Sequence, residues 1–100
     1  MRADANSTTI SRFTNVAMAA DARHLALCLS GAEDKKISTA LNTRRRAMVR
    51  LTATPAVNIT DIQRKCRVLE TAIEGTMIEE GGFGLIGSML QDLRNLGCDG

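Results

Sequence analysis

The chain has almost no aromatic residues: two of its 100 residues are phenylalanine, and none is tyrosine or tryptophan. A core must therefore be built from aliphatic side chains and methionine. Such a core suits packing between helices better than a β-sandwich, in which aromatic and β-branched residues dominate. The scarcity of rings also removes the usual platforms on which single-stranded nucleic acids stack their bases.

Long apolar runs are missing as well. One of the longest, at residues 25–29, has five residues, far fewer than the roughly 20 that cross a bilayer. The polar start of the chain also lacks the apolar segment of a secretory signal. The three cysteines, Cys28, Cys66 and Cys98, show no C-x-x-C spacing and are typical of a reducing compartment. We therefore expect no membrane contact and a cytoplasmic location.

Proline occurs once, at Pro55, and it disfavours a helical conformation for the residue before it. On both sides of Pro55, apolar residues recur at steps of three and four, the spacing that defines one face of a helix. These residues are Ile37, Leu41, Met48 and Leu51 before the turn, and Ile59, Ile62, Cys66, Leu69 and Ile73 after it. Thr60 and Gln63 match a capping box at the second helix start. The short connection predicts an antiparallel helical hairpin that turns at Pro55.

Two further helices complete the predicted fold. One runs from about residue 9 to a glycine cap at Gly31, and its apolar segment 25–29 predicts burial on more than one side. The other covers about residues 85–96 and is closed by Gly97. Residues 1–8 lack the pattern and are expected to form a flexible tail. The sequence therefore predicts an all-α fold of three to four helices, with a single domain over residues 9–100 and the hairpin at its centre.

Several short motifs follow one another in the second half of the chain. A Thr-Pro-Ala turn precedes the pattern I-x-x-I-x-x-K-C-x-V-L, an acidic stretch with glycines follows, and the segment SMLQDLRNL closes the series. In this order, over roughly residues 45–97, the motifs resemble a group of short proteins from alphaproteobacterial genomes and prophages. The resemblance implies a helical protein of bacterial or prophage context, and it assigns no catalytic residue.

Patterns for catalysis and metal binding are scarce. His24 is the only histidine, and one histidine without a C-x-x-C pair cannot form a structural zinc site. We interpret it as a packed or partly exposed side chain rather than a general base. Ser88 has no visible base beside it, and Glu79 and Glu80 are typical of solvated loop acids. We therefore expect a protein that is not an enzyme, with no catalytic, cofactor-binding or metal-binding residues and no cofactor.

Residues 82–87, GFGLIG, spell the G-x-G-x-x-G pattern of dinucleotide-binding proteins. That site also needs a strand before the glycines, a second strand, and an acid about 20 residues further on. Only 13 residues follow Gly87, and Glu79 and Glu80 would repel a phosphate. We therefore interpret this segment as a flexible loop between helices.

Charge is segregated along the chain, although the net charge is only +2. Residues 35–67 contain nine basic residues and one acid, whereas residues 68–100 contain six acids and one arginine. A basic segment of this kind is typical of a solvated or internally paired face, of a surface that binds phosphates, and of a surface that binds an acidic protein partner. The candidate nucleic-acid-binding residues are Arg44, Arg45, Arg46, Arg50, Arg64, Lys65 and Arg67.

Together, these patterns favour a small non-enzymatic interaction or accessory protein that binds an unknown protein partner through amphipathic helix faces. The alternative is a non-specific nucleic-acid-binding protein that uses residues 35–67. We also expect a homodimer, because the predicted helices have more apolar face than one copy of so small a domain can cover. A two-fold dimer is the commonest symmetric oligomer.

Overall fold

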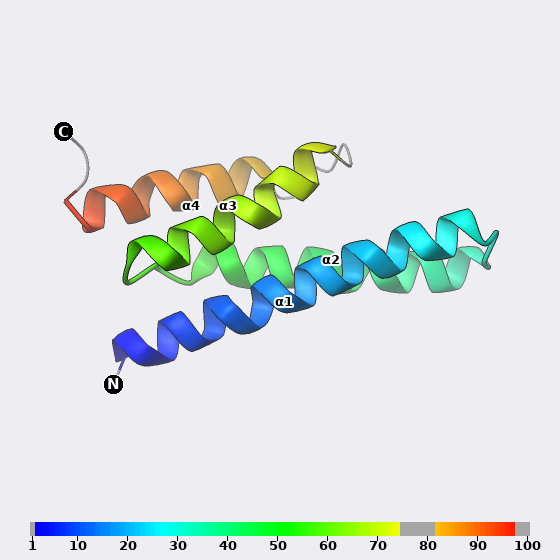
Figure 1. The fold of residues 1–100 in the computed structure, drawn as a ribbon, viewed down its shortest axis with the longest axis horizontal. Coiled ribbons are helices and arrows are strands. Elements are labelled where there is room, and N and C mark those ends of the chain that lie inside the picture. Colours follow the sequence, from blue (N-terminus) through cyan, green and yellow to red (C-terminus); the bar gives the residue numbers. More distant parts are fainter. Residues whose placement is uncertain (1, 75–81, 98–100) are drawn as a thin grey trace.

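In the computed structural model, which describes residues 2–74 and 82–97, four helices form two layers. Helix α1 spans Arg2–Leu29, α2 Asp34–Ala53, α3 Ile59–Glu74 and α4 Gly82–Asn95. Both α1 and α4 pack against α2 and α3. One layer therefore consists of α1 and α3, and the other of α2 and α4 (Figure 1). The predicted all-α fold of three to four helices is confirmed for the described residues.

The chain turns at Pro55, but α2 and α3 do not pack on each other as the predicted hairpin. They lie diagonally across the two layers and make only sparse contacts. A connection of five residues can span up to about 17 Å. This exceeds the diagonal of about 13 Å in a bundle whose neighbouring helices are 8–10 Å apart. The extensive hairpin is instead α1–α2, whose tight turn contains Gly31 with φ of 69°.

The first helix begins earlier than predicted. Residues 2–8, which were expected to form part of a tail, belong to α1. A tertiary contact explains the difference: the Ser7 hydroxyl donates to Asp61 Oδ1 of α3 at 2.8 Å. One turn further on, Ile10 is completely buried. Because both contacts join distant parts of the chain, the local sequence pattern did not indicate them.

The core lies where the four helices meet, and its fully buried apolar side chains are aliphatic. It includes Ile10 and Ala17 of α1, Met48 and Leu51 of α2, Val68 of α3 and Leu85 of α4. Phe13 packs at its edge. Since α4 starts at Gly82, the GFGLIG segment is helical rather than the predicted loop. Residues 79–81 of that loop lie outside the described residues. None of the described helices is long and apolar enough to cross a bilayer.

The α1–α2 hairpin extends past the ends of α3 and α4 (Figure 1). We call its residues 21–39 the hairpin tip, and none of them is buried. Leu25 and Leu29 are 60% and 81% exposed, and Cys28 between them is also exposed. The predicted burial of residues 25–29 on more than one side is therefore wrong, because neither α3 nor α4 reaches this end of the hairpin.

Candidate functional site

Two of the seven candidate nucleic-acid-binding residues are buried. Arg44 is 4% exposed and forms an ion pair with Asp21 of α1. Lys65 has no exposed surface at all. Neither side chain can reach a ligand on the molecular surface, so the basic segment 35–67 is not a uniformly solvated strip of charge.

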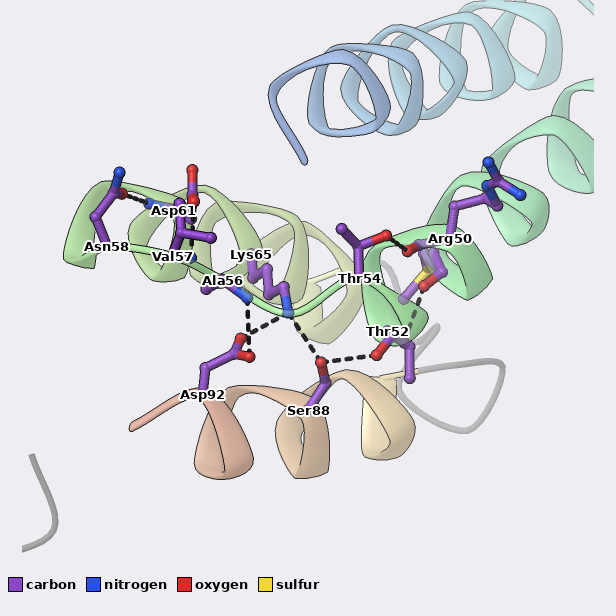
Figure 2. Close-up of polar contacts among 11 residues, drawn as sticks. Arg50, Thr52, Thr54, Ala56, Val57, Asn58, Asp61, Lys65, Ser88 and Asp92 are labelled. Carbon is purple, nitrogen blue, oxygen red and sulfur yellow. Dashed lines mark hydrogen bonds and ion pairs between the residues drawn. The ribbon is translucent and has the colours of Figure 1, made fainter. Parts of the chain in front are cut away.

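Lys65 is the centre of a polar network that joins three parts of the chain (Figure 2). Its Nζ donates to Asp92 Oδ2 at 2.6 Å and to Ser88 Oγ at 2.9 Å. Ser88 in turn donates to the carbonyl oxygen of Thr52 at 2.9 Å. The other Asp92 oxygen accepts a hydrogen bond from the Ala56 N–H at 3.0 Å. The network therefore ties α3 and α4 to the end of α2 and to the connection that follows it.

A serine beside a lysine occurs in some covalent catalysts, but here the geometry gives the pair a structural role. The Lys65 ammonium is paired with Asp92 and donates to Ser88, so it offers no lone pair to the serine proton. That proton is directed at Thr52, and Lys65 is sealed from solvent. The pair cannot be read from the sequence, since Lys65 and Ser88 are 23 positions apart.

A second buried acid, Asp61, organises the start of α3. Its N–H donates to Asn58 Oδ1 at 2.9 Å, and its carboxylate accepts a bond from the Val57 N–H at 3.1 Å. Asn58 therefore caps α3, two positions before the predicted capping box of Thr60 and Gln63. The sequence contained this alternative, because asparagine is as good a cap as threonine and an acid follows it three residues later.

The remaining basic candidates are divided between the two layers. Arg45 and Arg46 lie on the exposed side of α2, whereas Arg67 is exposed on α3. Arg64 is half-buried on α3 and pairs with Asp61 at 3.1 Å. The Arg50 guanidinium lies over the Phe13 ring, 5.3 Å from its centroid. The structure therefore does not bring the seven predicted residues onto one face.

The hairpin tip holds the one histidine of the sequence beside a cysteine. Cys28 Sγ lies 3.6 Å from His24 Nε2, one turn away on α1. Within residues 2–74 and 82–97, no group of three or more His, Cys, Asp or Glu side chains is placed to hold a metal ion. Cys28 and Cys66 are free thiols, and Cys98 lies outside the described residues.

Comparison of the chain with protein-family models, with curated proteins and with solved structures finds no match.

Proposed function

We propose that this is a small non-enzymatic interaction protein of a bacterial or prophage system, which associates with a second copy of itself through the hairpin tip. The observation that carries the proposal is the absence of any buried residue from 21 to 39. Two helices alone cover only the sides that face each other, so stable domains pack further helices against them. Elsewhere in the molecule α3 packs against both α1 and α4, and α4 packs against α2, so these two helices supply the cover. At the tip a second copy would supply it.

An apolar groove adjoins the tip and offers a place for a further helix. It has a volume of about 290 Å³ and is lined by Val16, Ala19, Ala20, Arg23, Thr39, Ala40 and Thr43. Four of these seven side chains are alanine or valine, and such small residues allow another helix to approach closely. Leu25 and Leu29 add exposed apolar surface on α1. Helical spacing places the two leucines on a different side of α1 from Val16 and Ala20, so the tip has apolar surface in more than one direction.

The charges of the tip favour a second copy over a partner of one charge sign. Glu33 and Asp34 follow the turn directly, and Lys35 and Lys36 come next, with Arg23 beside them around a shared pocket. In a two-fold arrangement with antiparallel tips, the acids of one copy face the bases of the other. Such a surface is complementary to itself.

Light scattering under reducing conditions tests the dimer, and reductant is needed because exposed Cys28 could cross-link copies. We expect a mass of twice 10.8 kDa at micromolar concentration. The double variant Leu25→Gln/Leu29→Gln should shift the protein to monomer. The matched control Val49→Gln/Leu90→Gln changes residues that are 65% and 54% exposed outside the tip, and it should leave the dimer intact.

A wild-type mass of 10.8 kDa would refute the homodimer. The partner that covers the hairpin tip would then be a different protein. Turnover of a substrate by the pure protein, abolished by one point substitution, would refute the non-enzymatic part of the proposal.

The free thiols of Cys28 and Cys66 support a cytoplasmic location, where thiols stay reduced.

Non-specific nucleic-acid binding is the alternative, and the exposure of Arg45, Arg46 and Arg67 favours it. Phosphate contacts release counterions, so log K should fall by about 0.9 for each contact per unit of log salt. A gel-shift assay with duplex DNA at low salt tests this, with Arg45→Gln/Arg46→Gln beside the wild type. A shift that the variant loses supports the alternative, and no shift by the wild type contradicts it.

A further inference from the structure

We propose that α1 and α3 form a binding site for a phosphate group carried by a small phosphorylated molecule. The site is a pocket of about 400 Å³, which is within the usual range for small-molecule sites. Its lining consists of three hydroxyl-bearing residues and two arginines: Ser7, Thr8, Ser11, Arg12 and Arg64. The site does not depend on the proposed dimer, because all its residues lie outside the hairpin tip.

Helical spacing brings the lining residues together. Ser7 and Ser11 are four positions apart on α1, as are Thr8 and Arg12, so the four side chains share one side of the helix. Helix α3 places Arg64 opposite them. Arg64 Nη1 donates to the buried Asp61 at 3.1 Å, which fixes the guanidinium at the pocket while 35% of the side chain remains exposed. A guanidinium has five N–H donors, more than this bond uses.

The charge around the pocket favours an anion. Arg12 and Arg50 both lie over the Phe13 ring, with their guanidinium carbons 5.5 Å and 5.3 Å from its centroid. The two cations are therefore within about 11 Å of each other, close to the distance over which salt screens charges. Arg64 is a third cation and pairs with the buried Asp61 carboxylate, whereas Arg12 and Arg50 contact the Phe13 ring. A bound anion would relieve the repulsion that remains.

Phosphate is the anion that matches this set of donors. A phosphate monoester has a charge of about −1.5 to −2 at pH 7 and three strong acceptor oxygens. The planar guanidinium fork fits phosphate geometry, and the forks of Arg12 and Arg64 with the Thr8 and Ser11 hydroxyls can bond several of these oxygens at once. The Ser7 hydroxyl lines the pocket, but its proton is donated to Asp61. Nucleic-acid backbones carry the same chemical group, so they form a separate arm of the test.

Titration with inorganic phosphate at constant ionic strength, followed by amide NMR signals, is the decisive measurement. We expect saturable shifts at residues 7–12 and 64. Arg12→Gln should weaken binding about tenfold or more. The matched control is Arg94→Gln, which removes the same charge from the exposed side of α4, outside both the pocket and the hairpin tip. Its affinity for phosphate should equal that of the wild type.

A second variant guards against effects on folding. Arg64→Lys keeps a positive charge for Asp61 but loses the planar fork, so it should weaken phosphate binding while the circular dichroism spectrum stays helical. Equal weakening by Arg94→Gln, or shifts that never saturate, would overturn the proposal. It would also be overturned if a short single-stranded oligonucleotide bound in an Arg12-dependent way while inorganic phosphate did not bind.

Discussion

Lys65 and Asp92 are opposite charges inside the core of a small domain, and both are almost completely removed from water. Transfer of a charge into such surroundings is costly unless it is paired and its other hydrogen-bonding groups are satisfied. Here Ser88 and the Ala56 N–H satisfy them. The pair therefore fixes how α4 lies against α3, since a slide of either helix would leave a buried charge without its partner.

Lys65→Met should destabilise the protein by about 3–5 kcal/mol, because it leaves Asp92 charged and unpaired in the core. Lys65→Met/Asp92→Asn should recover part of this loss, since asparagine is neutral and its oxygen can still accept from Ala56. Urea denaturation measures both values. Arg67→Met on the exposed side of α3 is the control and should change stability by no more than about 0.5 kcal/mol. A loss in Lys65→Met as small as in the control would contradict a structural role for the pair.

Two glycines, one within the last helix and one just after it, should respond to substitution in opposite directions. Gly87 lies within α4, and a Cβ added there meets no atom within 4 Å. Gly87→Ala should stabilise the protein by about 0.5–1 kcal/mol through helix propensity. Gly97 follows α4 with φ of 76°, so Gly97→Ala should cost about 1 kcal/mol or more. Thermal unfolding compares the two, and stabilisation by both would show that the left-handed turn at Gly97 is not required.

At the scale of elements, the side of α3 that is buried differs from the side that the apolar pattern predicted. Ile62 is buried as expected, but Ile59 is 50% exposed. Asp61, Lys65 and Val68 face the interior instead. Apolar periodicity assigns every charged residue to the outside of the molecule. It contains no information about a partner such as Asp92, which pairs with Lys65 from 27 positions further along the chain. The same limit hid Arg44 and its partner Asp21.

The start of α3 gives a direct test of which cap operates. Asn58→Ala should destabilise the protein by about 1 kcal/mol, because the Asp61 N–H loses its acceptor. Thr60→Ala alters the residue that the sequence favoured as the cap, but Thr60 is exposed inside the helix. It should change stability by less than about 0.5 kcal/mol. Chemical denaturation of both variants decides the matter, and the reverse order of effects would place the cap at Thr60.

For the whole molecule, helix content and turns were predictable, whereas the packing order was not. The single proline and the glycine caps at Gly31 and Gly97 act over a few residues, and the structure has a turn or helix end at each. Which helices become neighbours depends on contacts between distant residues, such as Ser7 with Asp61. The pocket proposed to bind phosphate could not be predicted for the same reason. The sequence grouped Arg64 with the other basic residues of segment 35–67, whereas the fold places it opposite Ser11 and Arg12 of α1.

The uneven distribution of buried residues predicts uneven stability along the α1–α2 hairpin. Amide hydrogen exchange should be fast in the hairpin tip, residues 21–39, and slow around Ile10, Met48 and Leu51, because local opening of the tip exposes no buried side chain. If a second copy covers the tip, its exchange should slow as protein concentration rises, while exchange of the core stays constant. Leu25→Gln/Leu29→Gln should remove the concentration dependence. Tip amides that exchange as slowly as the core in the dilute monomer would mean that two helices suffice to hold this end of the molecule together.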